Sequence, residues 1–300
     1  MFREVEIRTS GPVAVRYPTV ISKIDPDGKA HLTVTALLKN ASQTDISGQL
    51  KGKIGEVEFS QDVQLKPHEH KDVTFDPAQF AQLNLEHPRL WWPAQMGTPE
   101  LNELKLSFDV NGQTSDAAKT SFGIREVTSD LNEAGKRVFT INGKKLLIRG
   151  GGWSPDMMLR ENPQRLRDEF AYVRDMGLNT IRLEGKLENE DFFNLADEQG
   201  ILVMAGWCCC DAWEHWPEWT PEELPIAQAS LRDQIYRLRS HPSLLAWLNG
   251  SDNPPPPNVE QAYLQIEKQL QWPNAVISSA TAKATTVSGE SGVKMTGPYE

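Results

Sequence analysis

From about residue 138 onward, short apolar runs alternate with segments of helical periodicity, and this alternation constrains the fold more than any other feature. The apolar runs lie at 146–149, 178–183, 201–204, 244–248 and 275–279. Segments with helical spacing separate them, at 163–176, 189–199, 227–239 and 258–270. Strict alternation of strand and helix is typical of parallel β/α units. We therefore expect the first five strands of a (β/α)8 TIM barrel, a fold that needs eight.

Local signals support the helix boundaries. Asn162 offers an N-cap and Pro163 suits the first helical position, while Gly177 and Gly200 are stop signals. The glycine run 150–152 lacks the spacing of a dinucleotide-binding loop. We expect these glycines to let the first loop after a strand turn closely.

The first 125 residues have an all-β pattern. Apolar residues alternate with polar ones at 32–38 and 104–110, and polar turns such as 25–28 separate the runs. Short strands with such turns predict an immunoglobulin-like β-sandwich. We expect a remnant strand of an N-terminal jelly-roll domain over 1–9, the sandwich over 10–127, and the N-terminal part of a catalytic barrel over 128–300.

Composition excludes several classes of function. The net charge is −10 and no basic stripe is visible, which argues against nucleic acid as a partner. No apolar run is long enough to cross a membrane. The three cysteines are adjacent, at 208–210, and no spaced Cys/His set indicates a metal site. We expect buried thiols at a strand end, no metal and no cofactor.

Carboxylates and tryptophans gather where the strands end, which is where such barrels place their active sites. The candidates are Trp153, Asp156, Arg182, Glu184, Trp207, Asp211, Ser251 and Asp252. Glycoside hydrolysis uses one carboxyl group to protonate the leaving oxygen and a second as nucleophile or base. Histidine is too sparse here for a Ser-His-Asp triad.

Each candidate also has a structural interpretation. Asp252 is equally suited to cap a turn before Pro254. Arg182 and Glu184 lie on one side of a strand, so they also suit a structural ion pair. Some tryptophans of the segment 207–219 must pack against one another, and we expect one or two to face a substrate.

Several short segments together carry a family resemblance: FTINGK at 139–144, LIRGGG at 147–152, GLNTIRLEG at 177–185, GW at 206–207 with CCD at 209–211, GSD at 250–252 and KMTGPY at 294–299. In these segments the sequence resembles glycoside hydrolase family 2, and within it the exo-β-D-glucosaminidase (exo-chitosanase) branch. Most of the wider family has Asn-Glu at the acid position, whereas this branch has Ser-Asp, as here.

The resemblance implies a retaining exo-acting glycosidase that releases β-linked D-glucosamine from chitosan oligomers. Asp252 then matches the general acid/base, and Glu184 the residue that holds the 2-amino group. Arg182 matches the arginine that orients carboxylates, and Ser251 belongs to the Ser-Asp motif. The family's nucleophilic glutamate is expected beyond this chain, so we expect the chain itself to be inactive and to lack both ends of the complete enzyme.

Two other functions compete with this interpretation. One is another family 2 activity, such as β-mannosidase or β-galactosidase. The other is a non-catalytic remnant that binds carbohydrate through Glu184 and the tryptophans. For the enzyme, the expected partner is a cationic carbohydrate, with neither nucleic acid nor membrane. We expect a secreted or periplasmic location in preference to a cytoplasmic one.

Overall fold

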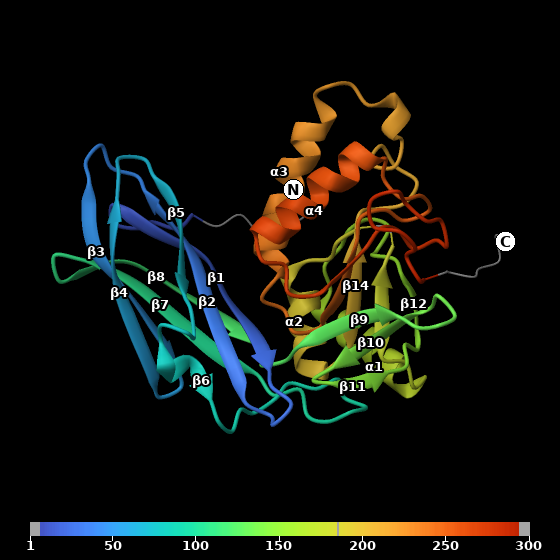
Figure 1. Cartoon of the computed structure of the whole chain (residues 1–300), viewed down its shortest axis with the longest axis horizontal. Coiled ribbons are helices and arrows are strands. Elements are labelled where there is room, and N and C mark those ends of the chain that lie inside the picture. Colours follow the sequence, from blue (N-terminus) through green and yellow to red (C-terminus); the bar gives the residue numbers. More distant parts are fainter. Residues whose placement is uncertain (1–6, 185, 294–300) are drawn as a thin grey trace. The chain divides into compact units, whose positions relative to one another are not determined.

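The computed structural model describes residues 7–184 and 186–293 (Figure 1). The chain divides into two compact units, one of residues 1–91 with 100–125 and the other of residues 92–99 with 126–300. The expected remnant strand at 1–9 falls mainly on residues outside the described part. The domain boundary at 127 stays a prediction.

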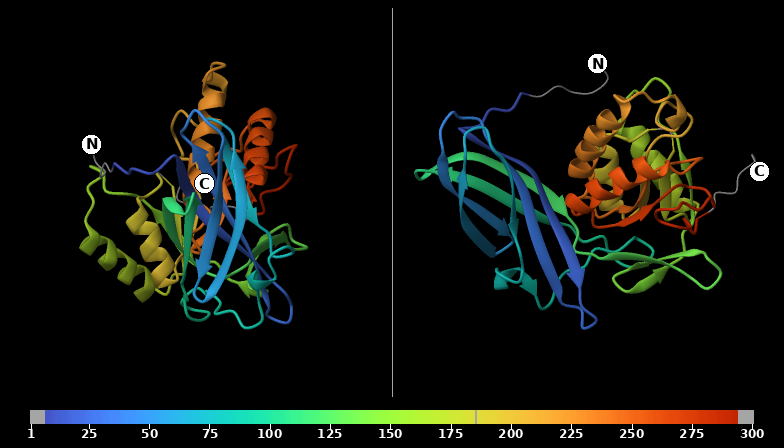
Figure 2. Two further views of the ribbon diagram at one scale, coloured as in Figure 1. Left: turned by 90° about the vertical axis from the view of Figure 1, so that its left-hand side faces the viewer. Right: turned by 45° about the horizontal axis from the view of Figure 1, so that its top comes forward.

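The first unit consists of two antiparallel sheets (Figure 2). One sheet contains β1 (Val13–Ile24), β2 (Ala30–Asn40), β5 (His70–Phe75) and β6 (Asn84–Leu85), with the short helix η1 (Ala81–Leu83) before β6. The other has the order β4-β3-β7-β8 and contains β3 (Ile46–Ile54), β4 (Val57–Leu65), β7 (Asn102–Val110) and β8 (Gln113–Phe122).

The core of the first unit follows from the alternation of its strands. Inward residues of β2, such as Leu32 and Leu38, join Leu50 of β3 and Phe108 of β7 in one buried cluster. Because successive side chains of a strand point to opposite faces, each sheet contributes every second residue to this core. The expected β-sandwich pattern is confirmed at these strands.

The second unit contains a three-stranded antiparallel sheet and a five-stranded parallel sheet. The antiparallel sheet is formed by β9 (Val127–Leu131), β10 (Arg137–Ile141) and β11 (Lys144–Leu146). The parallel sheet has strands in sequence order: β12 (Gly150–Trp153), β13 (Thr180–Leu183), β14 (Leu202–Gly206), β15 (Leu244–Leu248) and β16 (Ala275–Ile277).

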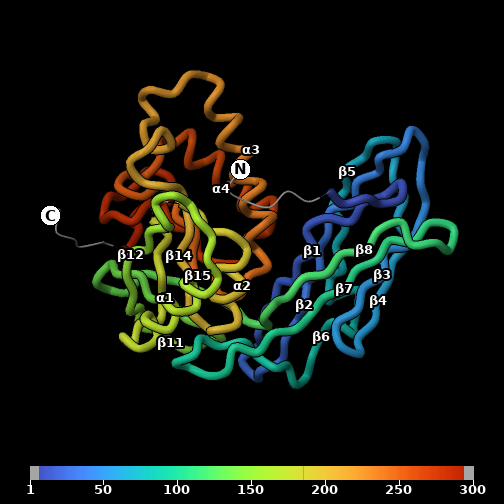
Figure 3. The backbone as a smooth tube through the Cα atoms, turned by 180° about the vertical axis from the view of Figure 1, so that it is seen from behind, coloured from blue at the N-terminus to red at the C-terminus, as the bar shows by residue number. Residues whose placement is uncertain are grey.

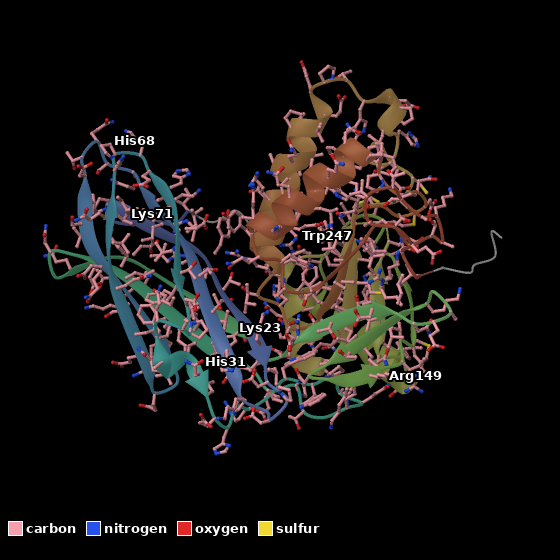
Figure 4. The ribbon with its side chains drawn as sticks, viewed as in Figure 1. Lys23, His31, His68, Lys71, Arg149 and Trp247 are labelled. Atoms are coloured by element: carbon pink, nitrogen blue, oxygen red, sulfur yellow. The ribbon has the colours of Figure 1, made fainter. Side chains whose placement is uncertain are left out.

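Helices connect the parallel strands (Figure 3). They are α1 (Pro163–Asp175), α2 (Glu190–Gln199), α3 (Glu223–Leu238) and α4 (Pro257–Gln269), with the short helix η2 (Trp216–Glu218) before α3. Every residue of β13 and of β15 is buried, as expected for parallel strands covered on both faces. Trp247 of β15, labelled in Figure 4, packs edge-on against Trp272. Among the described residues, no helix is long and apolar enough to cross a membrane.

The predicted helix boundaries are confirmed where capping residues define them. The Asn162 side chain accepts the backbone N–H groups of Gln164 and Arg165, and Pro163 is the first residue of α1. Gly200 ends α2 with φ 65°, and a Cβ there would lie 2.6 Å from the backbone nitrogen of Ala94. Both conditions favour glycine at that position.

The glycine run 150–152 differs from its prediction because it forms β12 itself rather than a loop. The expected strand at 146–149 is also wrong, since Leu146 ends the antiparallel β11. A Cβ at Gly150 would lie 2.2 Å from the carbonyl oxygen of Thr180. Glycine is therefore required by close approach to the neighbouring strand β13, and not by a turn.

Candidate active site

The parallel strands bring their carboxyl ends to one edge of the sheet, where Arg182 connects two of them. Arg182 is 8% exposed and belongs to β13. Its Nη1 atom lies 3.3 Å from Oε1 of Glu184, and its Nη2 atom donates to the hydroxyl oxygen of Ser251 at 2.5 Å. One buried guanidinium thus joins the end of β13 to the segment that follows β15.

Glu184 is partly open to solvent while its backbone is held. Its side chain is 38% exposed, so one face remains available beside the ion pair with Arg182. The backbone N–H of Cys209 donates to the carbonyl oxygen of Glu184 at 3.2 Å. A Cβ at Gly152 would lie 2.9 Å from Oε2 of Glu184. The absence of a side chain at Gly152 therefore leaves room for this carboxylate.

Asp252 is exposed, and among the described residues its side chain accepts no hydrogen bond from a backbone N–H group. Its carboxylate accepts a hydrogen bond from the Cys210 thiol, with Sγ 3.7 Å from Oδ2. The capping interpretation of Asp252 therefore has no support among the described contacts. Asp252 lies in the same neighbourhood as Glu184, because Cys209 contacts Glu184 and the adjacent Cys210 contacts Asp252.

The backbone on both sides of Asp252 is fixed by Glu214, a residue that sequence reasoning missed. Glu214 is 7% exposed, and its Oε1 atom accepts the N–H groups of Ser251 and Asn253. Lys283 donates to Oδ1 of Asn253 at 2.6 Å. The only sequence signal for Glu214 is an acidic residue within the tryptophan-rich segment after β14.

The tryptophans of that segment pack against one another. The ring centroid of Trp207 lies 5.2 Å from that of Trp213. It lies 5.4 Å from that of Tyr263, and the rings of Trp207 and Tyr263 are stacked. Trp213 packs edge-on against Trp219. Asp211 accepts the backbone N–H of Trp213 at 2.9 Å, which fixes the turn within this segment. Sugar contacts of Trp207 and Asp211 stay predictions.

Two further candidates have local partners after β12. The indole N–H of Trp153 donates to Glu188 at 2.8 Å, and its ring packs against Phe170 and Phe192.

Asp156 has a separate set of contacts. It accepts the backbone N–H of Met158 and forms ion pairs with Arg160 and Arg165, each at 3.0 Å. The hydrogen bond from Arg160 holds the pKa of Asp156 well below its usual range. A sugar contact of Trp153 or Asp156 stays a prediction.

The cysteine run does not match the expectation of buried thiols. Cys208 and Cys209 are half-buried, Cys210 is exposed, and all three are free. Burial raises the pKa of the Cys209 thiol to about 12, with further contributions from Cys210, Glu184 and Asp252. Within the described part of the chain, no group of three or more His, Cys, Asp or Glu side chains is arranged to hold a metal ion.

Comparison with known proteins agrees with this geometry. Residues 13–125 match the family model for glycosyl hydrolases family 2. The chain is 45% identical to an exo-β-D-glucosaminidase of Streptomyces avermitilis over 99% of its own length and 34% of that protein. It is 42% identical to the exo-β-D-glucosaminidase of Amycolatopsis orientalis over 99% of its length and 29% of that protein.

The chain belongs to glycosyl hydrolases family 2. Its fold superimposes on the exo-chitosanase CsxA of Amycolatopsis orientalis with a TM-score of 0.92 at 41% identity. That match covers 98% of this chain and 35% of CsxA, so the chain spans about a third of the relative's length. Two further CsxA structures are complexes with PNP-β-D-glucosamine, one of an aspartate-to-alanine variant and one of a glutamate-to-alanine variant.

More distant members share the fold. A family 2 β-galacturonidase from Eisenbergiella tayi matches with a TM-score of 0.76 at 20% identity, covering 90% of this chain and 47% of that protein. The arrangement of two antiparallel sheets followed by a parallel β/α sheet is therefore common to family 2 proteins of different specificity.

Proposed function

We propose that this chain belongs to a retaining, exo-acting glycoside hydrolase. It supplies the acid/base aspartate, Asp252, and the carboxylate that binds the amino sugar, Glu184. The substrate is chitosan or a chito-oligosaccharide, and the product is D-glucosamine from the non-reducing end. One observation carries the proposal: Arg182 links Glu184 after β13 to Ser251 after β15, directly beside Asp252.

Asp252 is suited to hand a proton to a departing sugar oxygen. Its carboxyl group is exposed, and its backbone is fixed on both sides by Glu214. Retaining glycosidases pair such an acid with a second carboxylate about 5–5.5 Å away that attacks the anomeric carbon. The family resemblance assigns that nucleophile to a glutamate on a later strand.

Glu184 supplies specificity for a 2-amino sugar. The ammonium group of glucosamine forms charge-assisted hydrogen bonds with a carboxylate, and these are stronger than neutral ones. A sugar with a 2-hydroxyl or N-acetyl group leaves Glu184 without that cationic partner. The acidic net charge of −10 also attracts a cationic substrate over long range.

The finer architecture belongs to the same proposal. The five parallel strands stand in sequence order, which is the order of the first five strands of a (β/α)8 barrel. The antiparallel sheets of the first unit correspond to an immunoglobulin-like sandwich. We place the enzyme outside the cytoplasm, because polymeric chitosan is too large to cross a membrane.

A family 2 mannosidase activity is the main alternative. The chain is 30% identical to a mannosylglycoprotein endo-β-mannosidase of Lilium longiflorum, over 86% of its length and 29% of that protein. The Ser251-Asp252 motif and the carboxylate at Glu184 favour the glucosaminidase. A non-catalytic carbohydrate-binding protein is the second alternative, which an assay of turnover separates from both enzymes.

The test uses a hybrid enzyme in which this chain replaces the matching third of the Amycolatopsis orientalis exo-β-D-glucosaminidase. We expect the hybrid to prefer the 4-nitrophenyl glycoside of β-D-glucosamine over those of β-D-mannose and β-D-galactose. Asp252→Ala should lower kcat on chitobiose on the order of a thousand-fold, because general acid catalysis contributes about that much. Binding of chitobiose, measured by calorimetry, should persist.

Asp233→Ala is the matched control, since Asp233 is an exposed carboxylate on α3. It should leave turnover unchanged. A preference of the folded hybrid for the mannoside, or full turnover by Asp252→Ala, contradicts the proposal.

A further inference from the structure

The dipeptide Cys209-Cys210, in the segment after β14, connects the backbone of Glu184 to the carboxylate of Asp252. The backbone N–H of Cys209 donates to the carbonyl oxygen of Glu184 at 3.2 Å. The Cys210 Sγ atom lies 3.7 Å from Oδ2 of Asp252. The Cys210 side chain is exposed, so its contact with Asp252 is not part of the buried core.

The backbone presents the Cys210 thiol in an unusual conformation. Cys210 has φ 59°, in the left-handed region that residues other than glycine, asparagine and aspartate rarely adopt. The neighbouring Cys209–Glu184 and Trp213–Asp211 hydrogen bonds hold this geometry. Backbone strain of this kind persists where the surroundings enforce it, and it clusters at functional sites.

The surroundings keep the Cys209 thiol in its protonated form. Burial, the hydrogen bond with Cys210 and the charges of Glu184 and Asp252 raise the pKa of Cys209. Two neighbouring cations contact other partners, whereas the charge of Lys186 acts on Cys208. Arg182 contacts Glu184 and Ser251, and Lys283 contacts Asn253. Glu214 adds a further carboxylate behind the Asp252 segment.

We propose that Cys210 is a positioning residue for the acid carboxylate of Asp252, a role that rests on the proposed glycosidase function. The S–H group of Cys210 donates to Oδ2, which leaves Oδ1 to carry the proton toward the glycosidic oxygen. Without this donor, the exposed carboxylate has no other described hydrogen bond to select one of its rotamers.

The first test compares two leaving groups in the hybrid enzyme. The sugar alcohol released from chitobiose needs a proton to depart, whereas 4-nitrophenolate does not. Cys210→Ala should therefore lower kcat/KM on chitobiose, which reports the step in which the leaving group departs, roughly ten-fold, a part of the full acid contribution. On 4-nitrophenyl β-D-glucosaminide the loss in kcat/KM should stay below about two-fold.

Cys210→Ser is the matched variant, because its hydroxyl group keeps a donor in the same place. It should restore most of the chitobiose activity. Equal losses of Cys210→Ala on both substrates would mean a merely structural role and overturn the inference.

The second test does not depend on turnover and uses the 300-residue chain. Iodoacetamide alkylates a thiolate, forming an S–C bond, releasing iodide and leaving the thiol proton in the buffer. Asp252→Asn removes the charge that repels the thiolate and leaves only a neutral amide oxygen, a weaker acceptor for the thiol proton. Alkylation of Cys210, followed by mass spectrometry of the peptide, should then accelerate roughly five-fold.

Cys208 is the internal reference and should react at the same rate in both proteins. An unchanged rate at Cys210 would show that the thiol and the carboxylate do not interact, and would overturn the inference even if the hybrid is a glucosaminidase. Accelerated alkylation together with a hybrid that cleaves no glucosaminide would instead contradict the proposed function alone.

Discussion

A single buried histidine makes the second unit sensitive to pH. His241 follows α3, and its Nδ1 atom lies 2.7 Å from Oδ2 of Asp197 while its Nε2 atom lies 3.5 Å from Glu190. Burial lowers the pKa of His241, but the charges and hydrogen bonds of Asp197 and Glu190 outweigh burial and raise it to about 9. A charged histidine between carboxylates therefore stabilises this part of the fold.

This charge predicts a loss of stability at alkaline pH. The folded pKa of about 9 exceeds the unfolded value of 6.5, so the stabilisation is complete below pH 6.5 and is lost as pH rises through 9. We expect the free energy of unfolding in urea to fall by ~3 kcal/mol across this window. His241→Asn should flatten the dependence, whereas His215→Asn, at an exposed histidine, should not. An equally steep pH dependence in His241→Asn would refute the assignment.

For individual residues, the sequence predicts the candidate site only where the geometry of one strand determines which side chains meet. Arg182 and Glu184 follow from period 2 along one strand, and their 3.3 Å contact agrees with that spacing. Cys210 and Glu214 were not predictable, because their partners Asp252 and Ser251 lie 42 and 37 residues further along the chain. No local pattern encodes which side chain an irregular loop directs toward a neighbouring strand end.

Among the elements, the loops after β14 and β15 act as one structure joined by Glu214. Its buried carboxylate accepts the N–H groups of Ser251 and Asn253, which flank Asp252. A buried N–H group that loses its acceptor costs about 1–3 kcal/mol. Glu214 therefore stabilises the fold and fixes the loop that carries the acid.

Replacing this residue separates its acceptor role from its charge. Glu214→Ala should lower the free energy of unfolding of the chain by about 2 kcal/mol, because two backbone donors lose their acceptor. Glu214→Gln retains an amide oxygen at the same position and should lose less than half as much. Urea denaturation measures both variants. Equal destabilisation by Gln and Ala would show that charge, and not the acceptor, matters here.

The bounds of helices and strands are predictable where the signals lie within a few residues. They are less predictable where contact with a neighbouring element determines the structure. Asn162 and Gly200 mark helix ends through contacts within a few residues. The strand β12 was missed because glycine has a low intrinsic preference for strands. Tertiary contact overrides that preference, since only glycine fits against Thr180 of β13.

For the whole molecule, catalytic activity depends on how many carboxylates lie at the ends of the parallel strands. Asp252 supplies an acid, and Glu184 is engaged by Arg182 and proposed to bind the 2-amino group. The family's nucleophilic glutamate has no assigned counterpart among the described residues. A retaining mechanism cannot form its glycosyl-enzyme intermediate with the acid alone.

The chain by itself should therefore bind a chito-oligosaccharide without cleaving it. We expect the purified 300-residue chain to release no glucosamine from chitotriose above the buffer blank, as measured by chromatography of the products, while the hybrid enzyme releases it. The contrast between the two proteins assigns the missing step to the nucleophile, since both contain Asp252 and its supporting residues. Release by the chain alone that disappears in Asp252→Ala would mean that a described carboxylate, with Glu184 as the first candidate, acts as nucleophile.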